Sequence, residues 1–259
     1  MNIQVLMSTM NRKEIKDLEL DKKNISNCLI INQTLEYLNP IKNDKYAMIS
    51  YNERGLAKSR NRLLENVSDD VNVGIITDDD VEFIKGYSDI VDRAYSEYPD
   101  ADIIIFKSLD EYGKERRDYP SKSKKLTKKD ILNVCSIEIS FKISSIKNNI
   151  SFDEKFGLGS KYKSGEENIF LNDCYNKKMN IYFYNEAINI HQRESTGSTW
   201  KEKDIFDKGA LFKRLYPHIC YFMVVPIAIV KNRICETNFI KTIFLLLNGI
   251  KDYKKEEIK

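Results

Sequence analysis

The sequence predicts an α/β protein with a mostly parallel central sheet flanked by helices and a helical C-terminal extension. Short apolar runs without a helical period recur in the first part of the chain, and each run stops on polar residues. Segments with helical character separate these runs. This alternation favours a parallel sheet covered on both faces, with a ligand at the carboxyl ends of the strands.

The first four apolar runs predict buried strands, which lie at 3–7, 28–33, 46–50 and 73–77. A helix is expected over 12–20, directly after the first strand. Another helix is expected in the block that begins at Glu53 and leads into the fourth strand. These elements alternate as a parallel sheet requires.

Further along the chain, apolar residues recur at helical spacing over 83–98, and a buried strand is expected at 102–106. Polar residues dominate 109–129, which predicts an exposed loop. A further helix opens after Gly165. Two short strands are expected beyond it, at 180–184 and 187–190.

Composition bounds the class of protein. The chain has 259 residues and is 42% hydrophobic, enough to bury the core of one large domain or of one domain with an appendage. Its net charge of +3 is too small to predict a nucleic-acid partner. The five cysteines are scattered without a C-x-x-C pair, which argues against a disulfide framework and a zinc site. Because the N-terminus also lacks a secretory signal pattern, we expect a cytoplasmic protein.

Three consecutive aspartates follow the fourth strand directly: Asp78, Asp79 and Asp80. Like charges at the end of an apolar strand repel one another, so folding them together costs free energy unless a cation or hydrogen-bond donors offset it. Carboxylate ligands favour a hard divalent ion such as Mg²⁺ or Mn²⁺, which also binds phosphate oxygens. A solvated turn that caps the next helix explains the same residues, because Asp is a preferred N-cap residue.

The surroundings of the aspartates resemble the core of the family 2 glycosyltransferases. Gly55-Leu-Ala-Lys-Ser-Arg-Asn61, a helix, a short apolar strand and Asp-x-Asp follow one another as they do in that family. The resemblance covers residues 1–200 and implies that this segment is a catalytic domain with the GT-A fold, a Rossmann-like nucleotide-sugar-binding fold. Residues 201–259 then form a separate helical extension.

The resemblance also implies a nucleotide site. Ser8, Thr9 and Asn11 occupy the place of the family's nucleotide-holding loop, although an ordinary strand-to-helix turn has the same residue types. Asn32 stands where the family usually has a base-contacting acid or amide. Arg60 matches the nucleotide-side residue of the family's helix motif, and a solvated basic helix face is the alternative.

A second acidic cluster follows a loop rich in glycine. Gly157, Gly159 and Gly165 allow a close approach of backbone to a ligand, and Glu166 and Glu167 then open a helix. The helix dipole stabilises acids at this place, so capping explains one of the two. The family has its catalytic base here, usually in a Glu-Asp pair; by position Glu167 matches the base and Glu166 the residue before it. Either carboxylate could accept the proton of an attacking hydroxyl.

One of the chain's two histidines, His191, comes directly after a predicted strand and opens a polar loop, 191–197. A lone histidine is more often a structural residue than a ligand. In some relatives within the family, this place supplies a third metal ligand or a diphosphate contact. The resemblance thus implies a divalent ion on Asp80 with Asp78 and His191 as further ligands, and nucleotide contacts from Asp78 and Asp79.

Residues 201–259 contain 12 Lys and Arg against 7 Asp and Glu, so they carry the whole positive excess of the chain. Two apolar runs, 219–230 and 239–247, are each shorter than the ~20 residues that span a bilayer. Apolar runs with interspersed basic residues are typical of segments that lie on an anionic membrane surface, and we expect this through 219–255. Packing of both runs on the catalytic domain or in a homodimer is the alternative.

Together, the motifs and the resemblance imply an inverting glycosyltransferase. It would move a sugar from a nucleoside diphosphate sugar, with UDP-sugars favoured, to a hydroxyl of a glycan or a lipid-linked acceptor, assisted by Mg²⁺ or Mn²⁺. Such an enzyme would act in the cytoplasm, including at the inner face of the cell membrane. A nucleotidyltransferase also needs Asp-x-Asp, a metal and phosphate-binding loops. A non-catalytic nucleotide-sugar-binding protein would keep the same fold.

Overall fold

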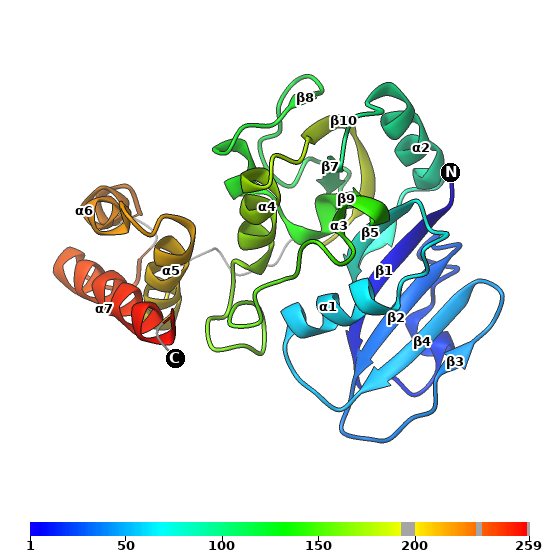
Figure 1. Cartoon of the computed structure of the whole chain (residues 1–259), viewed down its shortest axis with the longest axis horizontal. Helices are drawn as coiled ribbons and strands as arrows, with labels where there is room; N and C mark the ends of the chain where they lie inside the picture. Colours follow the sequence, from blue (N-terminus) through cyan, green and yellow to red (C-terminus); the bar gives the residue numbers. More distant parts are fainter. Residues whose placement is uncertain (193–199, 232–234, 258–259) are drawn as a thin grey trace.

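The computed structural model describes residues 1–192, 200–231 and 235–257. Within these residues one sheet is flanked by helices (Figure 1). Its strands are β1 (Ile3–Met10), β2 (Cys28–Gln33), β3 (Ile41–Lys42), β4 (Tyr46–Tyr51), β5 (Val73–Asp78), β6 (Glu82–Phe83), β7 (Ile103–Leu109), β8 (Lys124–Lys125), β9 (Ile139–Lys142) and β10 (Ile181–Ile190). The helices are α1 (Leu56–Asn66), α2 (Tyr87–Glu97), α3 (Ile143–Ile146), α4 (Glu166–Asn176), α5 (Glu202–Leu215), α6 (Cys220–Lys231) and α7 (Phe239–Glu257).

The strands lie in the order β3-β4-β2-β1-β5-β9-β7-β10-β6, with β8 paired to β10. β4, β2, β1 and β5 run parallel, and β7 and β10 form a second parallel pair. β9 lies between the two groups and is antiparallel to both neighbours. The predicted mostly parallel α/β fold is confirmed. The sequence analysis missed β9, because a strand of 4 residues gives too short a pattern to stand out.

The pairing register of the strands places their polar end residues side by side at one edge of the sheet. Ser8 of β1 is the partner of Asp78 of β5, and Thr9 of β1 is the partner of Asn32 of β2. β1 continues to Met10, so Ser8 and Thr9 belong to the strand and the prediction that they lie in a loop is wrong. Residues 70 positions apart in sequence thereby become neighbours at the carboxyl ends of parallel strands.

Apolar packing attaches helices to both faces of the sheet. α1, α3 and α4 contribute to the cluster on one face, and α2 contributes to the cluster on the other. The buried residues of α2 recur at helical spacing, namely Tyr87, Val91, Ala94 and Tyr95. The helix predicted over 83–98 is therefore confirmed, with a shorter span.

Four further predicted elements differ from the structure. The helix expected over 12–20 is reduced to a 3₁₀ helix at Ile15–Leu18, because Leu18 is its one buried residue and Glu19 turns left-handed with φ 51°. The two strands expected at 180–184 and 187–190 are one bulged strand, β10. The segment 109–129 is not uniformly exposed, since it contains β8 and the buried residues Asp110 and Leu126.

The C-terminal helices pack on one another at the end of the molecule opposite β3 and β4 (Figure 1). α5 and α7 approach so closely that a Cβ on Gly209 would lie 2.2 Å from the carbonyl oxygen of Leu246. A Cβ on Gly249 would lie 1.9 Å from the carbonyl oxygen of Phe206. Among the described helices, none has the length and apolar character that crossing a membrane requires.

α5 and α7 also pack against the remainder of the chain. Arg214 of α5 forms ion pairs with Asp153, at 3.0 Å, and with Asp173 of α4, at 2.6 Å. An apolar cluster that includes Phe156, Ile169 of α4 and Leu211 of α5 joins the two parts. The sides of α5 and α7 that face the rest of the chain are therefore packed against it, as the packing alternative for residues 201–259 expected. The predicted division at residue 200 adjoins 193–199, which lie outside the described residues.

Candidate active site

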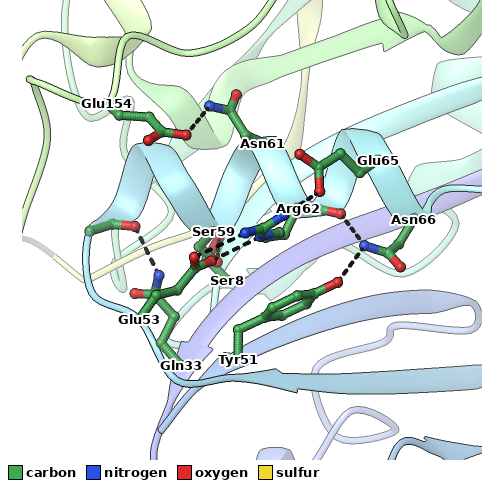
Figure 2. Close-up of polar contacts among 11 residues, drawn as sticks. Ser8, Gln33, Tyr51, Glu53, Ser59, Asn61, Arg62, Glu65, Asn66 and Glu154 are labelled. Carbon is green, nitrogen blue, oxygen red and sulfur yellow. Dashed lines mark hydrogen bonds and ion pairs between the residues drawn. The ribbon is translucent and has the colours of Figure 1, made fainter.

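Polar contacts fix α1 to the carboxyl ends of the strands (Figure 2). The Ser59 hydroxyl donates to the Ser8 hydroxyl at 2.9 Å. The Gln33 amide donates to the carbonyl oxygen of Gly55, the residue that precedes the helix, at 3.0 Å. Asn61 continues the attachment by donating to Glu154 at 3.0 Å. The helix is thereby held in one orientation, with the intervening Arg60 turned toward the interior.

Arg60 joins the two acidic clusters that the sequence analysis singled out. Its side chain is 1% exposed, and Nη1 donates to Glu166 Oε1 at 2.8 Å while Nη2 donates to Asp78 Oδ1 at 3.4 Å. The two acids come from different elements, α4 and β5. One buried guanidinium therefore places the start of α4 beside the end of β5. Contact of Arg60 with a nucleotide stays a prediction.

Each of the three aspartates has a different environment. Burial raises the pKa of Asp78, and the charge of Arg60 opposes that rise. Asp79 accepts from Arg12 Nη2 at 2.8 Å and from the Thr9 hydroxyl at 2.5 Å. Asp80 is 67% exposed at its side chain and lies 3.2 Å from His191 Nε2. The hydrogen bond from His191 lowers the pKa of Asp80, which favours the charged form of this exposed carboxylate.

The strand pairing explains how His191 reaches the aspartates. β10 runs antiparallel to β6, with Ile190 opposite Glu82. The backbone nitrogen of His191 donates to the carbonyl of Leu109 at 2.9 Å, which fixes the residue at the end of β10. Its Nδ1 is buried without a hydrogen-bond partner among the described residues. Residues 193–197 of the predicted polar loop lie outside the described part of the chain.

Glu166 and Glu167 take different positions although they are adjacent. Glu166 is 5% exposed and paired with Arg60, whereas Glu167 is partly exposed. Burial first, and then the charge of Glu166, raise the pKa of Glu167 to about 8. A carboxylate with a pKa near neutrality is suited to general-base catalysis. The two glutamates thus differ in burial and in pairing with Arg60, and the prediction that Glu167 is the base stays a prediction.

Close backbone packing holds the glutamates in place. Gly157 has φ 100°, and a Cβ there would lie 3.1 Å from the carboxylate of Glu166. Gly165, the N-cap of α4, has φ 105°, and a Cβ there would lie 2.7 Å from Leu211 of α5. Of the three glycines predicted to approach a ligand, these two make room for Glu166 and for α5. The tail therefore supports the start of α4.

The remaining predicted nucleotide residues lie near the aspartates. Asn32 is 0% exposed and bonds the backbone of Arg12 through both ends of its amide, at 3.0 and 2.8 Å. Asn11 is exposed and left-handed, with φ 55°. Ser8 and Thr9 bond Ser59 and Asp79, as described above. These contacts hold the loop after β1, and direct contact with a nucleotide stays a prediction.

Three basic residues at the site were missed. Arg12 binds Asp79, the ammonium of Lys23 donates to the carbonyl oxygen of Asp79, and Lys208 of α5 lowers the pKa of Glu167 by its charge. Arg12 directly follows the polar residues at the end of β1, which was the available signal. Lys23 and Lys208 carried no local signal, because both reach the site through tertiary packing.

Of the three predicted metal ligands, Asp80 and His191 lie together, and a metal ion on them stays a prediction. Within the described residues, no group of three or more His, Cys, Asp or Glu could hold a metal. Asp78, the third predicted ligand, is directed to Arg60. Mg²⁺ and Mn²⁺ nevertheless bind through one or two protein ligands when substrate phosphates and waters complete the shell. An exposed carboxylate beside a histidine nitrogen fits that arrangement.

Comparison with solved structures identifies the fold. Crystal structures of S. aureus TarS resemble this chain over 98–99% of its length. TarS 1–349 gives a TM-score of 0.58 at 13% identity over 92% of that chain. Its complex with UDP-GlcNAc gives 0.60 at 14% over 92%, and its complex with UDP gives 0.54 at 14% over 72%. No protein-family model and no curated protein matches the sequence. The chain shares its fold with TarS.

Proposed function

We propose that the protein transfers a sugar from a nucleoside diphosphate sugar, with UDP-sugars favoured, to a hydroxyl of a glycan or lipid-linked acceptor. The observation that carries the proposal is the Arg60 bridge, which joins Asp78 at the end of β5 to Glu166 at the start of α4. The likeness to TarS supports the choice of donor, since TarS was crystallised with UDP-GlcNAc and with UDP.

Glu167 is the proposed base. It would accept the proton of the acceptor hydroxyl while that oxygen attacks the anomeric carbon, and the sugar–phosphate bond would break toward the nucleoside diphosphate. One displacement of this kind inverts the anomeric configuration. Burial and the charge of Glu166 raise the pKa of Glu167 to about 8, which makes it a stronger base than an ordinary glutamate. Glu166 is the proposed positioning residue, because its carboxylate is bound to Arg60.

The β5 side of the site is the proposed diphosphate side. Asp80 and His191 would hold Mg²⁺ or Mn²⁺, which supplies charge neutralisation to the leaving diphosphate. Arg12 and Lys23 lie next to Asp79 and add positive charge at the same place. Asp79 is already engaged by Arg12, so its proposed contribution is to position that arginine at the nucleotide.

Incubation of the protein with UDP-sugars, Mn²⁺ and glycan or lipid-linked acceptors tests the proposal. Formation of UDP together with a glycosylated product of inverted anomeric configuration is expected. Release of pyrophosphate would instead assign a nucleotidyltransferase. Stabilisation by UDP-sugars in a thermal-shift assay, without turnover of any donor, would favour a non-catalytic binding protein, since any ligand of the native state raises apparent stability.

A further inference from the structure

Helix α6 exposes most of its apolar surface. Its one buried stripe is Cys220, Val224 and Ala228, which recur every four residues and face the other tail helices. The opposite side carries large apolar side chains, with Phe222 at 82% exposure and Ile229 at 62%. No charged residue occurs between Cys220 and Lys231. A helix that is apolar on all sides needs a second apolar environment.

The outward side of α7 is apolar at one end and basic at the other. Ile240 and Phe244 are 78% and 61% exposed. Lys251 and Lys255 follow them, and on an ideal helix all four side chains lie within about 60° of one another around the axis. Lys254 is also exposed. Within the described residues none of these three lysines forms an ion pair.

Two acids of α7, Asp252 and Glu256, bind the body of the protein. Asp252 and Glu256 bind Lys161, at 2.8 and 3.0 Å, and Tyr162 donates its hydroxyl to Asp252 at 2.9 Å. Their charges are therefore neutralised against the body of the protein. The lysines on the outward side stay exposed, and their ammonium groups are open to anions from solvent.

We infer that the exposed sides of α6 and α7, together called the outward face, bind an anionic lipid bilayer surface. The face consists of exposed apolar residues on and next to α6, the two on α7, and the three α7 lysines: Ile219, Phe222, Val225, Ile229, Val230, Ile240, Phe244, Lys251, Lys254 and Lys255. The apolar side chains enter the headgroup region and the ammonium groups pair with lipid phosphates. Residues 232–234, within the segment expected to bind membrane, lie outside the described residues.

Charge favours a lipid surface over a second copy of the chain. A two-fold contact presents the same patch on both subunits, so it would bring the lysines of both copies to one interface. Anionic headgroups offset those charges instead. The inference does not depend on the proposed enzymatic function, because the face lies on α6 and α7 and uses no residue of the candidate active site.

Co-sedimentation of the full chain with vesicles tests the inference. Binding is expected to vesicles of phosphatidylcholine with phosphatidylglycerol, to weaken in high salt, and to be much lower with phosphatidylcholine alone. The triple variant Lys251→Ala, Lys254→Ala, Lys255→Ala should lose roughly 100-fold in partitioning, since each basic residue contributes about 1 kcal/mol at such a surface. The double variant Phe222→Ser, Phe244→Ser should also weaken binding at every salt concentration.

A matched triple variant controls for overall charge. Lys42, Lys45 and Lys85 are exposed on other parts of the molecule, and changing all three to Ala removes the same charge. Binding should then stay within a few-fold of the unchanged protein. Point variants are used because deletion of 201–259 would expose Gly165 to solvent and leave Asp153 and Asp173 without their ion-pair partner Arg214.

The inference is overturned if the full chain ignores anionic vesicles or if both triple variants lose binding equally. It is also overturned if light scattering shows a dimer that the Phe222→Ser, Phe244→Ser variant dissociates, because the face would then be covered by a second copy. Retention of the thermal unfolding midpoint in each variant shows that the fold is intact.

Discussion

The two acidic clusters of this protein relieve the repulsion between neighbouring carboxylates in the same way, by pairing one of them with an arginine. They differ in the pKa of the remaining acid, which is lowered in one cluster and raised in the other. In each cluster an arginine holds a carboxylate: Arg60 binds both Asp78 and Glu166. In each cluster one acid stays less buried than its neighbour: Asp80 is exposed and Glu167 is half-buried. Asp80 at the end of β5 has a lowered pKa because His191 donates to it, whereas burial raises the pKa of Glu167 to about 8.

This difference suits the two sides of a transfer reaction. A carboxylate that stays charged across the accessible pH range is suited to a cation, and one that titrates near neutrality is suited to taking up a proton. Arg60 couples the two environments, since it contacts both clusters while being 1% exposed. The variants below separate the contribution of each acid and of the bridge.

The largest expected effect is on turnover. Glu167→Gln should lower kcat by about 10²–10⁴-fold, because the amide keeps the shape of the side chain and cannot accept the proton. Donor binding, measured by titration with a UDP-sugar, should stay close to that of the unchanged enzyme. Glu166→Gln is the comparison variant and should lose much less of the rate, because Glu166 positions the site through Arg60 and does not take the proton. The reverse pattern would exchange the roles of the two glutamates.

The next effect is on stability. Arg60→Met should lower the free energy of unfolding by about 3–5 kcal/mol in urea denaturation, since it leaves the buried carboxylate of Glu166 without its partner. Arg62→Met on the same helix is the control, because Arg62 is 37% exposed and its ion pairs with Glu53 and Glu65 contribute about 0–1 kcal/mol. If both variants lost the same free energy of unfolding, the ion pairs of buried Arg60 would stabilise the fold no more than those of exposed Arg62.

Asp80→Asn should abolish metal-dependent nucleotide binding while changing stability by no more than about 0.5 kcal/mol, because the side chain is 67% exposed. Calorimetric titration with UDP, with and without Mn²⁺, measures the first effect. Asp44→Asn, an exposed aspartate on the turn between β3 and β4, should change neither. Unchanged Mn²⁺ dependence in Asp80→Asn would contradict the metal assignment.

A smaller effect concerns how the free energy of unfolding depends on pH. From the ordinary glutamate pKa up to about 8, the folded protein retains a proton on Glu167 that the unfolded chain has lost. The stability from this group is therefore complete at low pH and is lost as the pH rises through about 8. Glu167→Gln should reduce the fall in urea midpoint between about pH 6 and about pH 9. An identical fall in both proteins would show that Glu167 does not titrate there.

Much of the fold was predictable because its signals are local. The buried strands are apolar runs that end on polar residues, and the structure confirms those at 28–33, 46–50 and 73–77 nearly to the residue. The helix expected over 12–20 failed because its charged residues are compatible with several conformations and few of its residues, chiefly Leu18 and Leu20, are buried. β9 escaped notice because its place between β5 and β7 depends on pairing with distant strands.

The candidate site was predictable to a lesser degree. Its acids stand next to each other in sequence, so both clusters were evident. Their partners were not, since Arg60 is 106 residues from Glu166 and Arg12 is 67 residues from Asp79. Which glutamate is buried depends on how α4 meets α1 and α5. Sequence spacing alone carries no information on that packing.

The dependence of kcat/KM on pH, for the unchanged enzyme and for Glu166→Gln, tests the central claim most directly. The unchanged enzyme should lose activity below a pH of about 8, where Glu167 becomes protonated. Glu166→Gln should move that midpoint to lower pH, because the negative charge of Glu166 is one cause of the raised pKa. A midpoint near the ordinary glutamate pKa, or one that Glu166→Gln leaves unchanged, would contradict the account.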